Sequence, residues 1–173
     1  MCKVLSDKFG IEKASMTTVH AYTSSQAIVD APNKKMRRGR SAAVSIVPTT
    51  TGAAIATTKV LPQLEGKMDG LAMRVPVADG SIIDFVAETE KAVTVEKVNQ
   101  AFREAAENGM KGILGITDEE LVSADIVDST YSALIDAQST MTLGGHTVKV
   151  LAWYDNEWGY ARRVADLAHQ MSK

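Results

Sequence analysis

Strand-like segments that occur in pairs across glycine turns constrain the fold of this chain most strongly. Apolar residues alternate over 71–77, the turn signal Asp79-Gly80 follows, and residues 82–88 form a second strand-like segment, which together predict a hairpin. The turn Gly144-Gly145-His146 is flanked in the same way and predicts a second hairpin. The segments that predict helices do not alternate regularly with the strands; they cover residues 3–9, 53–61, 95–107 and 157–171. We therefore expect an α+β fold with a largely antiparallel mixed sheet and helices packed on one face.

Length and composition favour one globular domain. The chain has 173 residues, of which 45% are hydrophobic and 23% are charged, ordinary values for a domain with its own core. The sequence contains no internal repeat, low-complexity tract or linker, so we expect a single domain over residues 1–173. No Gly-x-Gly-x-x-Gly sequence follows a predicted strand, so nothing predicts a dinucleotide-binding Rossmann unit.

Charge and cysteine content exclude several classes of function. The formal net charge is −2, which gives the whole chain no general attraction to nucleic acids or anionic membranes. The single cysteine, Cys2, rules out an internal disulfide and a cysteine-based zinc cluster, and we predict no metal site. The first residues lack the long apolar segment of a secretory signal, and no apolar run approaches the roughly 20 residues that span a bilayer. We expect a cytoplasmic protein without a membrane partner.

His20 is the first candidate for chemistry. It lies near the end of a strand predicted over residues 16–22 and before a long polar segment, a position typical of active-site residues. A histidine with an ordinary pKa of about 6.5 suits proton transfer at neutral pH. The alternative is a surface or hydrogen-bonded structural histidine. His146, in a glycine turn, and His169, in a predicted helix, are interpreted as structural.

Two further features are compatible with anion binding. The run Thr49-Thr50-Thr51-Gly52 precedes a predicted helix, and hydroxyls with free N–H groups at a helix N-terminus form a phosphate site. Its alternative is simple helix capping. Arg74 points to the face opposite the apolar residues of the 71–77 strand, where it could clamp a phosphate with two parallel hydrogen bonds. Its alternative is a solvated or salt-bridged side chain on an exposed face.

Residues 23–44 form a long polar segment without helical or strand periodicity. A loop of this length in a compact domain is usually functional or disordered. A dense group of cations lies within it: Lys34, Lys35, Arg37, Arg38 and Arg40. This group could bind phosphate, nucleotide or nucleic acid, or it could be a solvated surface. No aromatic residue interleaves with the cations, which weakens the interpretation as a single-strand-binding site.

The run Trp153–Tyr160 concentrates four aromatic residues around an aspartate, an asparagine and a glutamate. It contains both tryptophans of the chain. The Asn156 amide offers both a donor and an acceptor and could bind a carboxamide. The alternative is a core-packing junction between strand and helix, capped by Asp155 or Asn156. The two interpretations stay open at this point.

Taken together, these stretches resemble the C-terminal catalytic domain of phosphorylating glyceraldehyde-3-phosphate dehydrogenases. The matching segments follow the family's order and spacing; they are Thr17–Thr23, Arg37–Arg40, Pro48–Ala54, Met73–Val77 and Trp153–Tyr160. The resemblance implies a cytoplasmic glycolytic oxidoreductase that converts the aldehyde to 1,3-bisphosphoglycerate with NAD or NADP. Erythrose-4-phosphate dehydrogenases are the nearest rival family. The intact threonine run and the Tyr22-Thr23 pair favour the glyceraldehyde phosphate enzymes.

The resemblance also implies the substrate sites. His20 corresponds to the general base that takes the thiol and hemithioacetal protons. Thr23 and Arg74 correspond to the site for the C3 phosphate of the substrate. The site for inorganic phosphate corresponds to Arg38, Thr51 and the backbone of Gly52.

The cofactor and subunit contacts follow in the same way. Asn156 corresponds to the residue that holds the nicotinamide carboxamide, with Tyr160 beside it. Residues 22–44 correspond to the family's S-shaped loop, which reaches the cofactor site of a neighbouring subunit. The resemblance therefore implies a homo-oligomer or assembly with a nucleotide-binding chain.

Two parts of the family's machinery are not found in these residues. One is the nucleophilic cysteine of a Ser-Cys-Thr-Thr-Asn-Cys stretch, since Cys2 matches a small residue within the family's following helix. The other is the N-terminal dinucleotide-binding domain. We therefore expect residues 1–173 alone to bind cofactor weakly or not at all and to be inactive.

Two other roles are considered for the chain. A non-catalytic module that assembles with a nucleotide-binding chain would expose apolar faces on helices 3–9 and 157–171. Nucleic-acid binding would have to come from the basic loop alone, because the net charge of −2 disfavours it elsewhere.

Overall fold

A seven-stranded mixed sheet in the order β2-β3-β1-β4-β7-β6-β5 organises this computed structural model, which describes residues 1–172. Four of the six neighbouring strand pairs are antiparallel, while β1–β3 and β5–β6 are parallel. The strands are β1 (Lys13–Ala21), β2 (Val47–Thr50), β3 (Met68–Val75), β4 (Ser81–Glu88), β5 (Leu114–Thr117), β6 (Ala133–Leu143) and β7 (Thr147–Tyr154). The predicted α+β fold with a largely antiparallel mixed sheet is confirmed.

The α-helices form close to where the sequence predicts them. They are α1 (Cys2–Phe9), α2 (Ala53–Val60), α3 (Val95–Glu107) and α4 (Trp158–Met171), and short 3-10 turns cover Met36–Gly39, Pro62–Leu64 and Ser123–Ile126. The start of α3 illustrates why: the Thr94 hydroxyl accepts a hydrogen bond from the Lys97 N–H, and Glu96 lies in the first turn. Both features stabilise a helix N-terminus. Within residues 1–172 no helix is long and apolar enough to cross a membrane.

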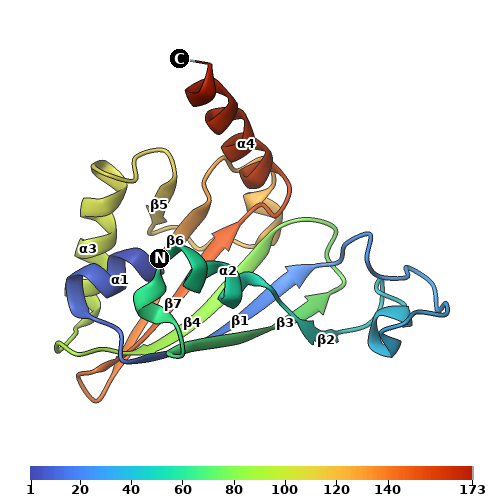
Figure 1. Ribbon diagram of the computed structural model, residues 1–173, viewed down its shortest axis with the longest axis horizontal. Coiled ribbons are helices and arrows are strands. Elements are labelled where there is room, and N and C mark those ends of the chain that lie inside the picture. The colour runs from blue at the N-terminus through green and yellow to red at the C-terminus, as the bar shows by residue number, and fades with distance from the viewer. Residues whose placement is uncertain (173) are drawn as a thin grey trace.

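Helices cover one face of the sheet over part of its length. Figure 1 shows α1 and α3 side by side over one half of the sheet, with α2 next to them. Their apolar faces bury Leu5 and Phe102, which join Phe85 of β4 and Val150 of β7 in one core. This half of the sheet is therefore closed to solvent on the helix side, while the ends of β1 and β3 extend beyond α1 and α3.

The hairpin predicted at Asp79-Gly80 is wrong. The turn itself forms, and Gly80 adopts a φ of 85°, a backbone conformation that favours glycine. However, β1 lies between the two strands that the turn connects, because it pairs in parallel with β3 and antiparallel with β4. A turn signal specifies a reversal of the chain but not which strands pair. The hairpin predicted at Gly144-Gly145 is confirmed, since β6 and β7 are neighbours.

The two terminal helices differ from each other in their packing. The apolar face expected to be exposed on helix 3–9 is instead buried, because Val4, Leu5 and Phe9 pack into the core. The helix α4 projects away from the sheet in Figure 1. Its side chains Leu167 and Met171 are 57% and 80% exposed, as expected for helix 157–171.

Phe102 provides a test of this packing. Its side chain is fully buried between α3 and the sheet, so Phe102→Ala leaves a cavity and should lower the free energy of unfolding by about 3–5 kcal/mol. Denaturant unfolding followed by circular dichroism measures the change. The matched control is Leu167→Ala on the exposed side of α4, which should change stability by about 0.5 kcal/mol or less. Equal losses in the two variants would contradict the described core.

Candidate functional site

Polar side chains lie on the same face of the sheet as α1 and α3, in the part that these helices leave uncovered. His20 of β1 and Arg74 of β3 are register partners. Side chains alternate between faces along a strand, so His20 lies on the same face as Met16, which is part of the core. The two residues stand at the ends of β1 and β3 that point away from α1 and α3 (Figure 1). The expected position of Arg74, on the face opposite Leu71 and Met73, is confirmed.

His20 and Arg74 contact each other directly. The His20 Nδ1 atom lies 2.7 Å from Arg74 Nη1 and 2.7 Å from the Ala21 carbonyl oxygen, and Arg74 Nη1 donates to the same carbonyl at 3.0 Å. A neutral imidazole carries one proton, so Nδ1 either donates to the carbonyl or accepts from the guanidinium. When Nδ1 donates, Nε2 keeps its lone pair and serves as a proton acceptor.

The surroundings of His20 favour its neutral form. Burial lowers the pKa of His20 below its ordinary value, the Ala21 carbonyl offsets part of the shift, and the Arg74 charge lowers the pKa further. The Tyr154 ring packs edge-on against the imidazole at a centroid distance of 5.9 Å. Burial raises the pKa of Tyr154 to about 12, so its hydroxyl stays protonated at neutral pH.

Positive charge gathers near His20 without carboxylates to balance it. Burial lowers the pKa of Arg74, and the charge of nearby Arg38 lowers it further. Among the residues that the structure describes, neither arginine forms a salt bridge with an acidic side chain. Two guanidinium groups close together without counter-charges attract an anion, and phosphate oxygens suit their donor geometry.

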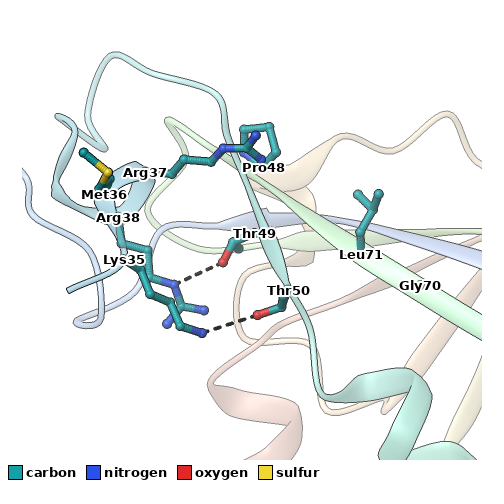
Figure 2. Close-up of a pocket in the computed structure, with 9 residues that line it drawn as sticks. All are labelled: Lys35, Met36, Arg37, Arg38, Pro48, Thr49, Thr50, Gly70 and Leu71. Atoms are coloured by element: carbon teal, nitrogen blue, oxygen red, sulfur yellow. Dashed lines mark hydrogen bonds between the residues drawn. The ribbon is translucent and has the colours of Figure 1, made fainter. Parts of the chain in front are cut away.

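The basic loop joins β2 at a pocket that Figure 2 shows in detail. Arg38 Nε donates to the Thr49 hydroxyl at 3.1 Å, and Lys35 Nζ lies 3.5 Å from the Thr50 hydroxyl. The cavity has a volume of about 490 Å³, and Leu71 contributes to its wall. The loop therefore brings cations and threonine hydroxyls together at one pocket, from which the charge of Arg38 acts on Arg74.

Other predicted phosphate residues are engaged locally. The Thr51 hydroxyl accepts from the Ala53 N–H at the start of α2, with Gly52 as the exposed N-cap residue. Thr51 therefore binds an N–H group at the start of α2, as the alternative interpretation of helix capping predicts. The Thr23 hydroxyl lies 3.0 Å from the Ser25 hydroxyl, and within residues 1–172 no hydrogen bond joins Thr23 to Arg74.

Gln26 is a buried neighbour of Thr23 that the sequence analysis did not single out. Its side-chain oxygen accepts from the Thr23 N–H at 3.3 Å. Gln26 is 7% exposed, and its amide nitrogen has no partner among the described residues. The start of the loop is thus held by a side chain whose burial no local sequence signal indicates.

In the Trp153–Tyr160 run, Asp155 binds the start of a helix and Asn156 is half-buried. Asp155 is 2% exposed and accepts from the backbone N–H groups of Asp128, Glu157 and Trp158. Burial alone would raise the pKa of Asp155, but these hydrogen bonds lower it. The Asp155 carboxylate therefore binds the N–H groups at the start of α4, where Glu157 is the N-cap residue. Trp158 and Tyr160 are exposed instead of packing in a core.

Asn156 is held by Ser81, a residue that the sequence analysis missed. The Ser81 hydroxyl donates to Asn156 Oδ1 at 2.7 Å and accepts from the Ala21 N–H at 3.1 Å. Because Oδ1 faces the Ser81 hydroxyl, the NH₂ group of Asn156 is the part of the amide turned away from Ser81, and it suits the carbonyl oxygen of a carboxamide. Tyr160 lies one turn further on, at the start of α4, and is 74% exposed.

Comparison with known proteins identifies relatives over nearly the whole chain. Residues 1–156 match the family described as glyceraldehyde 3-phosphate dehydrogenase, C-terminal domain. The chain is 58% identical over 166 residues to the glyceraldehyde-3-phosphate dehydrogenase of Geobacillus stearothermophilus, which covers 96% of this chain and 50% of that protein. It is 55% identical over 170 residues to glyceraldehyde-3-phosphate dehydrogenase 1 of Bacillus cereus, covering 98% of this chain and 51% of that protein. The chain therefore spans about half the length of these curated relatives.

The charge of Arg74 should be measurable through His20. Arg74→Gln removes a cation next to the imidazole, so the pKa of His20 should rise part of the way toward its ordinary value of about 6.5. The shift should stay incomplete, because burial still disfavours the charged ring. A pH titration of the imidazole C–H resonances by NMR measures it.

The control is Arg37→Gln, which removes an equal charge from an exposed side chain of the loop. An unchanged or lower pKa of His20 in Arg74→Gln would contradict the described pair.

Proposed function

We propose a function on the premise that this chain belongs to the glyceraldehyde-3-phosphate dehydrogenase family, as a C-terminal domain. Residues 1–173, a single catalytic domain, supply the general base and the phosphate-binding side chains for oxidation of a phosphorylated aldehyde. The nucleophilic thiol and most of the cofactor site come from a nucleotide-binding half. The observation that carries this proposal is the 2.7 Å contact between His20 and Arg74 at the open ends of two parallel strands.

His20 acts as the general base in this proposal. A neutral imidazole with its Nδ1–H turned to the Ala21 carbonyl has Nε2 ready to accept a proton. It takes the proton of a thiol that attacks the aldehyde and returns it to the former carbonyl oxygen, which gives the hemithioacetal hydroxyl. It then accepts that hydroxyl proton as hydride leaves the carbon. A depressed pKa keeps His20 neutral and able to accept at neutral pH.

The arginines bind the two phosphate groups. Arg74, with Thr23, binds the C3 phosphate of glyceraldehyde 3-phosphate. Arg38, with Thr51 and the Gly52 backbone, binds the inorganic phosphate that attacks the thioester and yields 1,3-bisphosphoglycerate. Arg74 contacts the base directly, and the charge of Arg38 acts on Arg74, so in this proposal both anions are held around one reacting carbon.

Asn156 and Tyr160 contribute to the cofactor site. NAD or NADP supplies the hydride acceptor of the reaction when it is bound. The NH₂ group of Asn156 holds the carboxamide oxygen, and Tyr160 lies beside the ring. Most of the cofactor's contacts lie elsewhere, so we propose weak or absent cofactor binding by residues 1–173 alone.

Two uncovered apolar surfaces support assembly with other chains. On the face opposite the helices, the register aligns Met73, Val19, Ile82 and Trp153 in one row across four strands, all of them half-buried. This row suits a second copy of the chain in a homo-oligomer. The exposed side of α4 suits a nucleotide-binding half. We propose that the assembled protein is a cytoplasmic glycolytic enzyme.

The segment 22–44 supports the role of an S-shaped loop between subunits. Backbone hydrogen bonds from Ala27 to Arg38 and from Ala42 to Ala27 hold its path. Its apolar side chains Val29 and Met36 are 75% and 87% exposed. A loop with an ordered path and exposed apolar side chains is suited to contact a neighbouring subunit.

Phosphate binding by the chain is the first test. Inorganic phosphate should shift the backbone amide resonances around Gly52 in an NMR titration. Arg38→Ala should weaken this binding by about tenfold or more, because a hydrogen bond between charged groups contributes about 1.5–3 kcal/mol. The control Lys34→Ala removes the same charge from an exposed position of the same loop that does not line the pocket. Equal weakening in both variants would mean nonspecific attraction and would contradict the site.

Turnover is the second test. Residues 1–173 alone should form no NADH from glyceraldehyde 3-phosphate, NAD and phosphate. When residues 1–173 are fused to the C-terminus of the nucleotide-binding half of the Geobacillus stearothermophilus relative, the joined protein should form NADH from the same substrates. In the joined protein, His20→Ala should lower kcat by a factor of about 10²–10⁴ because general-base catalysis is lost.

The control for the joined protein is His146→Ala, an exposed histidine in the β6–β7 turn at the opposite end of β7 from the site, which should leave kcat unchanged. Turnover by residues 1–173 alone would contradict the proposal. An active joined protein that tolerates His20→Ala would contradict the role of His20.

A further inference from the structure

Ser81 occupies a buried position between two parts of the site. It is the first residue of β4 and is 1% exposed. Its hydroxyl accepts from the Ala21 N–H at 3.1 Å and donates to Asn156 Oδ1 at 2.7 Å. A hydroxyl carries a single proton, so this arrangement uses that proton for Asn156 and orients the amide with its NH₂ group away from Ser81.

The peptide of Ala21 extends this connection to the base. Its N–H binds Ser81, while its carbonyl oxygen lies 2.7 Å from His20 Nδ1 and 3.0 Å from Arg74 Nη1. Asn156 and His20 are therefore linked through one hydroxyl and one peptide unit. A shift of the Ser81 hydroxyl would release the amide of Asn156 without removing any group that contacts substrate.

We infer that Ser81 is a positioning residue that holds the Asn156 NH₂ group toward the carboxamide oxygen of a nicotinamide cofactor. Through the Ala21 peptide it also fixes the position of Asn156 relative to His20. This inference rests on the proposed function. Ser81 itself does not reach a ligand, because its side chain is enclosed between β1 and the segment that follows β7. In this inference it acts on the cofactor through the orientation of Asn156.

The inference predicts a specific kinetic pattern in the joined protein described above. Ser81→Ala should raise KM for the cofactor about tenfold, the effect of one lost hydrogen bond, while KM for the aldehyde stays within about twofold. Asn156→Ala should raise KM for the cofactor at least as much. The double variant should be no worse than Asn156→Ala, because without the amide Ser81 has nothing to position.

Several results would overturn the inference. The first is an unchanged KM for the cofactor in Ser81→Ala, and the second is an unchanged KM for the cofactor in Asn156→Ala. The third is a double variant in which the effects of the two substitutions on KM add up in full. Additive losses would mean that Ser81 acts only as a structural residue. Should Ser81→Ala fail to fold, Ser81→Cys keeps a similar shape with a weaker donor and should give an intermediate KM.

Failure of the proposed function is recognisable separately. A joined protein without turnover would contradict the proposed function. The NMR signals of the Asn156 side-chain NH₂ group then test whether Ser81 orients this amide. In residues 1–173, Ser81→Ala should shift these signals and speed their exchange with water. Unchanged Asn156 NH₂ signals in this variant would contradict the positioning role of Ser81.

Discussion

The parallel pairing of β1 with β3 is the constraint on which the whole site depends. Parallel strands end at the same edge of a sheet, so this pairing sets His20 directly opposite Arg74. Parallel neighbours also require a long crossover between them. Here the crossover comprises residues 22–67 and contains the basic loop, β2 and α2. The cations and hydroxyls of the proposed phosphate sites therefore lie in a connection that the topology itself demands.

The antiparallel strands complete the same edge. β4 runs opposite to β1, so it begins where β1 ends and delivers Ser81 next to Ala21. β7 runs opposite to β4 and ends at this edge again, which brings Tyr154 against His20 and Asn156 against Ser81. The ends of β1, β3 and β7 and the start of β4 thus meet at one edge, because β1, β3 and β7 run in one direction and β4 runs in the other. No side chain of the site has to reach far from the backbone that carries it.

Local sequence signals predicted the elements well but not their neighbours. The Thr94 cap and the Gly144-Gly145 turn are local devices, and both form where the sequence indicates. The Asp79-Gly80 turn is equally clear, yet the strands around it are separated by β1, which comes from 60 residues earlier in the chain. Pairing of strands also depends on burial across the whole sheet, and the Asp79-Gly80 turn reverses the chain without pairing the two strands on either side of it.

The same limit explains which site residues the sequence could reveal. The sequence marks a histidine at the end of a strand, an arginine within a strand and an asparagine in an aromatic run. These are His20, Arg74 and Asn156, and each is an unusual residue type for its local sequence. Ser81 and Gln26 are not marked in this way, since a serine at the start of a strand and a glutamine in a loop are ordinary. Their importance comes from burial and from partners distant in sequence, which only the assembled sheet specifies.

The two faces of the sheet divide the work of the domain. On the helix side, α1 and α3 bury one half and leave the other half to polar groups. On the opposite side, the row from Met73 to Trp153 stays uncovered, and α4 projects with its apolar side exposed. These exposed surfaces support the assembly proposed above, in which the α1–α3 core stabilises the domain and the proposed site lies at surfaces that pack against other chains.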